Sequence, residues 1–213
     1  MAYETPRPEI AARVPLAARR VLDLGCAAGG LATLLKARQP VEVVGVELDA
    51  TYAAAAAARC DRVVHADVEA LARDASELGR FDCVVAADVL EHLVDPWSAL
   101  RAYAKLLEPH GTAVVSLPNV GHWSTYWHLA RGTWPRLPEG VHDATHLRWF
   151  TLRDARELLA QAGLRVQAVD RRPRLLWRGS RLDDLLGPAA VRIPVLRALV
   201  SFQYVLAAYP ARP

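Results

Sequence analysis

Three acidic residues and a glycine-rich turn form the part of the sequence best suited to hold a ligand. Asp23 lies inside the stretch VLDLGCAAGG, Glu47 ends VEVVGVE, and Asp67 follows RVVHA. Glycines let the backbone approach a ligand closely, and a helix that starts after such a turn presents free N–H groups to an anionic part. Each carboxylate has two oxygens that accept hydrogen bonds from hydroxyl or amino groups. The pattern predicts a polar ligand that lies across several strand ends.

Histidines in the second half of the chain provide a second set of reactive side chains. His142 and His146 lie in VHDATHLRWFT, with Asp143 beside His142. Histidine titrates near neutral pH, so it can take a proton from a hydroxyl group, and an acid can orient the ring. We expect these three residues to be catalytic. The alternative is that His146, with Thr145 and Arg148, only ties this segment to the rest of the protein.

Composition limits the classes of protein that the chain can represent. The 213 residues are 53% hydrophobic and 23% charged, with a formal net charge of +3, which is typical of one soluble domain covering 1–213. This balance favours no nucleic-acid partner. The three cysteines have no metal-type spacing and are expected to be reduced core thiols. The N-terminus resembles no signal peptide, and no apolar run could span a bilayer, so we expect a cytoplasmic protein.

The hydrophobic pattern repeats a short strand, a turn and a helix through the first half. Apolar runs indicate strands at 19–24, 41–47, 62–67, 81–88 and 112–118, and helices at 31–38, 51–60, 68–78 and 96–108. A helix at 151–163 and strands at 164–172 and 201–209 follow. This alternation predicts an α/β fold with a mostly parallel, doubly wound sheet.

Two longer segments interrupt this pattern and are predicted to be cap insertions, at about 119–145 and 173–199. The first contains three of the six tryptophans, and both contain glycines and prolines. A helix near 191–200 carries arginines beside apolar residues, which would also suit a membrane surface. We favour packing over the sheet or against a second copy of the chain, so a homodimer could help to close the pocket.

Two kinds of ligand could bind at the glycine turn, a dinucleotide or S-adenosylmethionine. The dinucleotide fingerprint G-x-G-x-x-G falls on Gly25, Ala27 and Gly30, so its middle glycine, which admits the pyrophosphate, is replaced by alanine. S-adenosylmethionine has no pyrophosphate and brings an amino group, a carboxylate and a sulfonium. It needs a carboxylate close to the turn, and Asp23 lies two residues before Gly25.

The motifs VLDLGCAAGG, GVELD, HADVEAL and FDCVVAADVLEHLVDP together resemble those of class I S-adenosylmethionine-dependent methyltransferases over about residues 19–118. The resemblance implies a Rossmann-like, seven-stranded sheet with an antiparallel last strand, and S-adenosylmethionine as cofactor. Glu47 would bind the ribose hydroxyls, and Asp67 the adenine amino group. The cofactor-binding residues that it implies are Asp23, Gly25, Cys26, Ala27, Gly29, Glu47, Leu48, Asp67, Val68, Ala87 and Asp88.

Each of these acids also has a purely structural interpretation. Asp23 could cap the helix start, Glu47 could be a solvated charge at a strand end, and Asp67 could be an N-cap. Asp88, Glu91 and His92 resemble the acid-x-x-Glu-His pattern by which some methyltransferases of this class bind a divalent metal, and a further histidine from the first insertion could complete such a site. The Glu-His pair is also common in relatives with no known metal, so we predict no metal.

The segments SLPNVGHWSTYWHLARGTW and VHDATHLRWFT resemble those of a bacterial subgroup often associated with polysaccharide and secondary-metabolite pathways, and the first also resembles MetW-type proteins. The substrate-binding residues expected from them are His122, Trp123, Tyr126 and Trp127, although the aromatic ones could instead form a small core. Before the first strand, Tyr3, Arg7 and Pro8 are expected to reach over the cofactor.

These observations predict in-line methyl transfer to a hydroxyl or amine of a small molecule or saccharide, with a histidine as base. A MetW-like cofactor-binding regulator without turnover is the main alternative, and a dinucleotide-dependent oxidoreductase is a weaker one. A nucleic-acid methyltransferase is disfavoured because Asp88-Val89-Leu90-Glu91 replaces a flipped-base motif such as Asn/Asp-Pro-Pro-Tyr.

Overall fold

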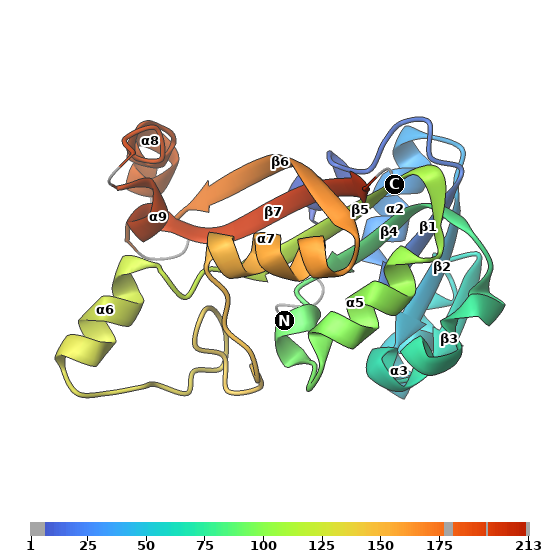
Figure 1. The fold of residues 1–213 in the computed structure, drawn as a ribbon, viewed down its shortest axis with the longest axis horizontal. Coiled ribbons are helices and arrows are strands. Elements are labelled where there is room, and N and C mark those ends of the chain that lie inside the picture. The colour runs from blue at the N-terminus through green and yellow to red at the C-terminus, as the bar shows by residue number, and fades with distance from the viewer. Residues whose placement is uncertain (1–6, 177–180, 195, 212–213) are drawn as a thin grey trace.

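A seven-stranded sheet forms the centre of the computed structural model, which describes residues 7–176, 181–194 and 196–211 (Figure 1). Its strand order is β3-β2-β1-β4-β5-β7-β6. The strands are β1 (Arg20–Leu24), β2 (Glu42–Glu47), β3 (Arg62–His65), β4 (Phe81–Ala87), β5 (Leu107–Pro118), β6 (Leu164–Pro173) and β7 (Ser201–Pro210). Strand β7 pairs antiparallel with both β5 and β6, while the pairs from β3 to β5 are parallel. The predicted Rossmann-like α/β fold with an antiparallel last strand is therefore confirmed.

Helices connect the strands and cover both faces of the sheet. They are α1 (Pro8–Ala11), α2 (Gly30–Arg38), α3 (Ala50–Ala56), α4 (Val68–Leu71), α5 (Pro96–Ala104), α6 (Trp123–Ala130), α7 (Leu152–Gln161), α8 (Arg181–Ala190) and α9 (Arg197–Val200), with 3-10 helices η2 (Ala72–Leu78) and η3 (Leu90–His92). Helices α5 and α7 lie in front of the sheet in Figure 1, and α2 lies behind it. None of the helices in the described part of the chain is long and apolar enough to cross a bilayer.

Two buried clusters follow from this layering. One contains Phe81, Tyr103 and Leu158, on the face covered by α5 and α7. The other contains Ile10 of α1 and Leu35 of α2, on the opposite face. A parallel sheet that is buried on both faces requires strands that are apolar throughout, which explains the continuous apolar runs.

Strand β5 begins earlier than the sequence pattern predicted. Leu106 and Leu107 continue the apolar spacing of the preceding helix, so the sequence indicated helix as far as residue 108. In the structure α5 ends at Ala104, and Leu107 pairs with Phe81 at the start of β4. Pairing with the neighbouring strand overrides the local helical pattern here.

Each of the two cap insertions contains a helix. The segment 119–145 holds α6, and the segment 173–199 holds α8 and the start of α9, although residues 177–180 and 195 lie outside the described part. In Figure 1 these helices lie at one end of the molecule, beyond the ends of β6 and β7. The predicted contact of Tyr3 with the cofactor also lies outside the described residues.

Candidate active site

The strand order reverses between β1 and β4, and the crevice at their carboxyl ends is where open α/β sheets bind ligands. The turn between β1 and α2 borders this crevice. Gly25, Ala27 and Gly29 have φ angles of 66°, 45° and 78°, and a Cβ atom on Gly25 would lie 2.5 Å from Cγ2 of Val89. The N–H groups of Gly25 and Cys26 both donate to the carbonyl of Val46, at 2.8 and 3.0 Å. The turn is therefore held tightly against the end of β2.

Glu47 connects the end of β2 to this turn. Its Oε2 accepts a hydrogen bond from the N–H of Ala27 at 2.8 Å, and its Oε1 accepts one from the N–H of Asp49 at 2.9 Å. Each carboxylate oxygen has a second lone pair, so the same group can accept from ligand hydroxyls. The half-buried carboxylate is thus oriented beside the turn, which fits the ribose of S-adenosylmethionine.

Asp23 lies inside β1, where its side chain is buried. Burial raises the pKa of this carboxyl well above its ordinary value, and the nearby charges of Cys60 and Glu47 raise it further. A positively charged amino group beside Asp23 would favour the ionised carboxylate again. This environment fits the amino end of the cofactor better than it fits a pyrophosphate.

Asp67 performs the structural role that the sequence left open. Its Oδ1 accepts from the N–H groups of Glu69 at 2.6 Å and Ala70 at 3.2 Å, which makes it the N-cap of α4. The next residue, Val68, is buried, while Leu48 at the end of β2 is exposed. The binding of the adenine by Asp67 and Val68, and of the cofactor by Leu48, stays a prediction.

Asp88 follows Ala87 at the end of β4 and has a positive φ of 58°. Its carboxylate accepts from the guanidinium of Arg7, from Oγ of Ser116 at 2.9 Å and from Nε2 of Gln203 at 2.5 Å. The contact with Arg7 brings the segment before α1 to the carboxyl end of β4. Arg7 therefore lies beside the crevice, at the methionine end of the predicted cofactor site.

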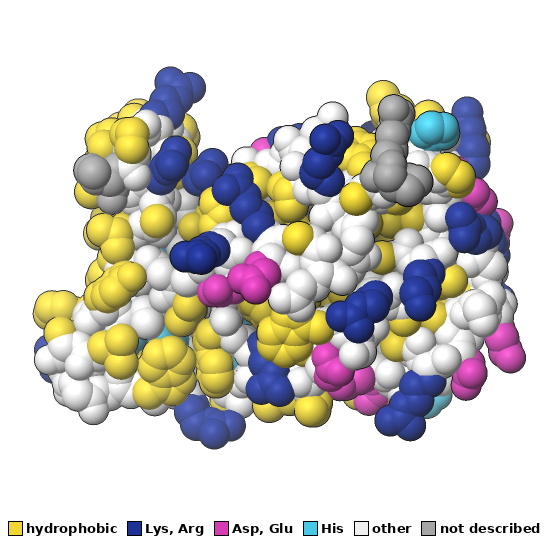
Figure 2. Space-filling model, in the orientation of Figure 1, with side chains coloured by type: hydrophobic (Ala, Val, Ile, Leu, Met, Phe, Trp, Pro, Cys, Tyr) yellow, Lys and Arg dark blue, Asp and Glu magenta, His cyan; other side chains and the backbone are white. Residues whose placement is uncertain are grey.

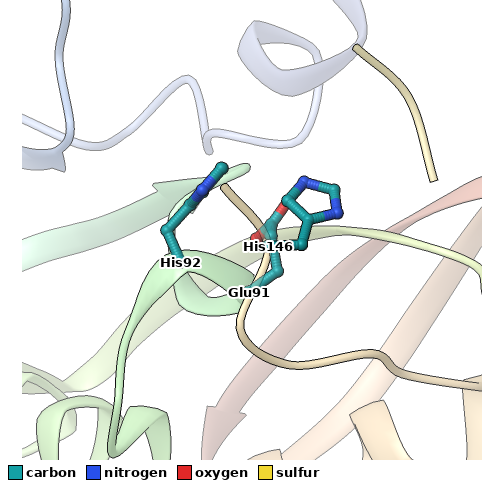
Figure 3. Close-up of side chains that lie close together, drawn as sticks. All are labelled: Glu91, His92 and His146. Atoms are coloured by element: carbon teal, nitrogen blue, oxygen red, sulfur yellow. The ribbon is translucent and has the colours of Figure 1, made fainter. Parts of the chain in front are cut away.

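Glu91, His92 and His146 form a compact cluster next to Asp88 (Figure 3). Glu91 and His92 come from η3, and His146 comes from the loop before α7. Potential ligand atoms of the three side chains lie within 4.8 Å of one another, and Nε2 of His146 is 4.0 Å from Oε1 of Glu91. Among the described residues, Oε2 of Glu91 has no hydrogen-bond partner although it is buried.

The protonation states in this cluster follow from burial and from one hydrogen bond. Burial raises the pKa of Glu91 well above its ordinary value, with the charge of Asp88 as the next cause. Burial lowers the pKa of His146, so its ring is neutral at neutral pH. Its Nδ1 lies 3.1 Å from the carbonyl oxygen of Val141, which can only accept, so Nδ1 carries the proton. The Nε2 atom facing Glu91 is consequently a free proton acceptor.

The same cluster has a donor set that a divalent metal could use, namely one carboxylate and two imidazoles. Asp88, the first acid of the metal-binding pattern, is instead directed toward Arg7, Ser116 and Gln203. The third potential ligand in the structure is therefore His146, in the place that the sequence pattern gives to Asp88. The absence of a metal stays a prediction.

The two other predicted catalytic residues differ in their relation to this cluster. His142 is buried in the first insertion, where its Nε2 is 3.3 Å from Oγ1 of Thr125 and its ring contacts His128 and Trp134. The carboxylate of Asp143 accepts from the N–H and the hydroxyl of Thr145, and Oγ1 of Thr145 lies 3.1 Å from Nδ1 of His92, so Asp143 is linked to the cluster through Thr145.

The N–H groups of Leu147 and Arg148 both donate to the carbonyl of Glu91, at 2.8 and 3.0 Å. The guanidinium of Arg148 also donates to the carbonyl of Val94. The segment around His146 is therefore tied to η3 and to the loop after it. This agrees with the structural interpretation of the segment, and it also fixes the position of the His146 ring.

The predicted substrate-binding residues differ in their surroundings. His122 is buried and caps α6, and its Nε2 donates to the carbonyl of Arg174 at 2.7 Å. Trp123, Tyr126 and Trp127 of α6 are all partly exposed, with Tyr126 and Trp127 at 56%. Figure 2 shows hydrophobic side chains gathered over the end of the molecule where α6 lies. These aromatic residues do not form a closed core, so they are available to a ligand.

The sequence offers Glu91 only as a candidate metal ligand, whereas the structure places its buried carboxyl beside His146. Glu91 lies among apolar residues in the stretch VLEHL directly after a buried strand, and an acid in such a position is a signal of burial. The contacts of Asp88 with Arg7 and Gln203 leave no comparable signal, because these residues are far apart in the chain.

The sheet order, the glycine turn and the acids at the strand ends define a class I S-adenosylmethionine-dependent methyltransferase, and S-adenosylmethionine is its cofactor. Residues 3–169 match the model of a protein family whose description is "Methyltransferase domain". The chain belongs to this family.

Two curated relatives are both ubiquinone biosynthesis O-methyltransferases. The protein from Marinobacter nauticus is 32% identical over 165 residues, covering 74% of this chain and 68% of its own length. The protein from Psychrobacter arcticus is 31% identical over 168 residues, covering 74% of this chain and 63% of its own. The chain thus spans about two thirds of these relatives. A solved methyltransferase from Archaeoglobus fulgidus shares the fold, with a TM-score of 0.66, 18% identity, and coverage of 98% of this chain and 96% of its own.

Proposed function

We propose that the protein transfers a methyl group from S-adenosylmethionine to a hydroxyl group of a small-molecule or saccharide acceptor, with His146 as the general base. Membership of the methyltransferase family and the O-methyltransferase names of the curated relatives support the choice of oxygen. The observation that carries the proposal is the free Nε2 atom of His146, which lies beside a buried carboxyl at the carboxyl end of β4.

The cofactor supplies a methyl group that is already activated on a sulfonium. The protein must then hold the acceptor oxygen in line with that bond and remove the proton from the hydroxyl. Asp23, the glycine turn and Glu47 would hold the cofactor in the crevice between β1 and β4. The cluster follows the end of β4, so His146 would reach an acceptor placed at the methyl end of the crevice.

Glu91 suits the role of a partner that stabilises His146 after proton transfer. Before transfer, burial raises the pKa of Glu91 and lowers that of His146, which favours the uncharged form of both groups. When Nε2 takes the proton, the positive charge of the imidazolium 4.0 Å from Oε1 favours the ionised carboxylate of Glu91, which in turn stabilises the imidazolium. The hydrogen bond from Nδ1 of His146 to the carbonyl of Val141 keeps the imidazole in the tautomer that leaves Nε2 unprotonated.

His142 is a poorer candidate for the base than the sequence suggested. Its Nε2 is engaged with Thr125, and its ring is enclosed by His128 and Trp134 within the insertion. Burial lowers the pKa of His142 as well. We assign it a structural role in the insertion, while Trp123, Tyr126 and Trp127 remain the proposed binding surface for the acceptor.

The test is a methyl-transfer assay with labelled S-adenosylmethionine and matched acceptors that carry a hydroxyl, an amine or hydrogen at the same position. We expect transfer to the hydroxyl acceptor, and a fall in kcat of at least about 100-fold in His146→Asn. The matched variant His142→Asn should retain kcat within about threefold once it is shown to be folded. Transfer to the amine alone, or an equal loss in both variants, would overturn the proposal. Cofactor binding without turnover on any acceptor would instead support a regulator.

A further inference from the structure

Two of the three cysteines meet directly beneath the glycine turn. Cys26 belongs to the turn, and Cys60 follows α3. A Cβ atom on Gly45 of β2 would lie 2.5 Å from Sγ of Cys26 and 3.3 Å from Sγ of Cys60. Both sulfur atoms therefore pack against the same glycine. The lack of a side chain at Gly45 is what makes room for this contact.

We propose that Cys26 and Cys60 form a reversible disulfide under oxidising conditions, and that this modification weakens cofactor binding by displacing the glycine turn. The proposal rests on the cofactor site and is independent of the acceptor and of the base. Cys83 lies in β4, is buried, and is the unpaired thiol of the three. It serves as an internal reference.

The reaction balances with hydrogen peroxide as the oxidant. The thiolate of one cysteine attacks a peroxide oxygen to give a sulfenic acid and hydroxide, and the second thiol then attacks the sulfenic sulfur and releases water. Two thiols and one peroxide give one disulfide and two waters. Cys60 is the better first nucleophile because the neighbouring Cys26 thiol lowers its pKa, as do the charges of Lys36 and Arg59.

The disulfide would change the geometry of the turn. A disulfide requires an S–S distance of about 2.05 Å, which is much shorter than the non-bonded contact of two packed sulfur atoms. Cys60 is anchored by the hydrogen bond from its N–H to the carbonyl of Ala56 at 2.8 Å. Cys26 is likewise held by the hydrogen bond from its N–H to the carbonyl of Val46 at 3.0 Å, so closing the disulfide strains the turn at Cys26. This strain reaches the adjacent Ala27, whose N–H donates to Glu47. Oxidation pulls Ala27 away from Glu47 and disturbs the surface that holds the cofactor.

The experiment uses the full chain, treated with hydrogen peroxide and then with dithiothreitol. Peptide mapping without reduction should find a Cys26–Cys60 disulfide and a free Cys83. Titration with S-adenosylhomocysteine should show that the Kd rises about tenfold or more on oxidation and returns on reduction. Saturating S-adenosylhomocysteine should slow disulfide formation, because the bound ligand holds the turn in place.

Two variants separate this disulfide from general oxidative damage. Cys60→Ala should bind S-adenosylhomocysteine normally when reduced and should lose its response to peroxide, while Cys83→Ala should respond as the original chain does. If Cys60→Ala is poorly folded, Cys60→Ser provides the same test with a closer match in size. Absence of the Cys26–Cys60 bond, an unchanged Kd after it forms, or a full response in Cys60→Ala would overturn the proposal. Failure of the reduced chain to bind would refute the cofactor site itself.

Discussion

The backbone N–H of Ala27 donates a hydrogen bond to the carboxylate of Glu47 at 2.8 Å, which ties the turn after β1 to the end of β2. Two parts of the predicted cofactor site thus hold each other in position. A ribose bound by Glu47 and a methionine group lying on the turn would meet surfaces whose spacing is already fixed. Such preorganisation lowers the free energy lost on binding, because the protein groups need little further ordering.

Gly25→Ala is expected to weaken cofactor binding strongly. Gly25 has a positive φ, and the new Cβ would lie 2.5 Å from Cγ2 of Val89, so the turn must move. Gly132→Ala is the matched control, because its φ of 69° is similar but the new Cβ meets nothing within 4 Å. Both variants should lose about 1 kcal/mol of stability from backbone strain. Titration with S-adenosylhomocysteine should show a raised Kd in Gly25→Ala alone, and equal Kd values would contradict this account of the turn.

Arg7→Gln is expected to raise the Kd for the cofactor by several-fold, on the order of 1 kcal/mol. The guanidinium joins the segment before α1 to Asp88, and the pair is only partly buried, so a modest effect is expected. Arg13→Gln offers a control, because Arg13 forms a similar ion pair with Asp170, on a different element from Asp88. The two variants should have similar thermal stability, and only Arg7→Gln should change the Kd. Unchanged binding in Arg7→Gln would show that this segment does not contribute to the site.

The pH dependence of the reaction should report the base. A base must be neutral to accept a proton, and burial lowers the pKa of His146 below its ordinary 6.5. The rate should therefore be constant above about pH 6.5 and should fall only as the pH decreases through the lowered value. The measurement is kcat/KM from pH 5 to 9, together with a stability control at each pH. A rate that keeps rising above pH 7 would contradict a neutral His146 as base.

Removal of metal ions separates the two uses of the Glu91, His92 and His146 cluster. We predict that extensive dialysis against a chelator leaves kcat within about twofold, because the sulfonium is already activated and the proposed base needs no Lewis acid. The control is readdition of magnesium, manganese or zinc ions one at a time. Loss of activity on chelation, with recovery on readdition, would assign the cluster as a metal site.

The residues of the proposed cofactor site can be placed from the sequence because they directly follow apolar strands. Glu47 and Asp67 each end or follow such a run, so the strand pattern alone places both at the carboxyl edge of the sheet. The same pattern could not place His146 against Glu91, because the loop between the first insertion and α7 has no period. That contact depends on backbone hydrogen bonds from Leu147 and Arg148, which only the folded chain reveals.

Contacts between segments that are far apart in the chain could not be predicted from the sequence either. Arg7 and Asp88 are separated by 81 positions, and neither has a pattern that selects the other. The meeting of Cys26 and Cys60 depends on Gly45, which reads in the sequence as an ordinary interruption of an apolar strand. The prediction of where β5 starts was wrong for a related reason. The local sequence around Leu107 fits a helix, and it fits a strand only when Phe81 lies beside it.

The most direct measurement is calorimetric titration of the full chain with S-adenosylmethionine and S-adenosylhomocysteine, beside the double variant Glu47→Ala, Asp67→Ala. The account predicts a Kd on the order of micromolar for at least one ligand, and its loss in the double variant. Because Asp67 caps α4, the folding of that variant must be confirmed by thermal unfolding. Failure of both ligands to bind, with binding of a nicotinamide dinucleotide instead, would contradict the assignment of the strand-end acids.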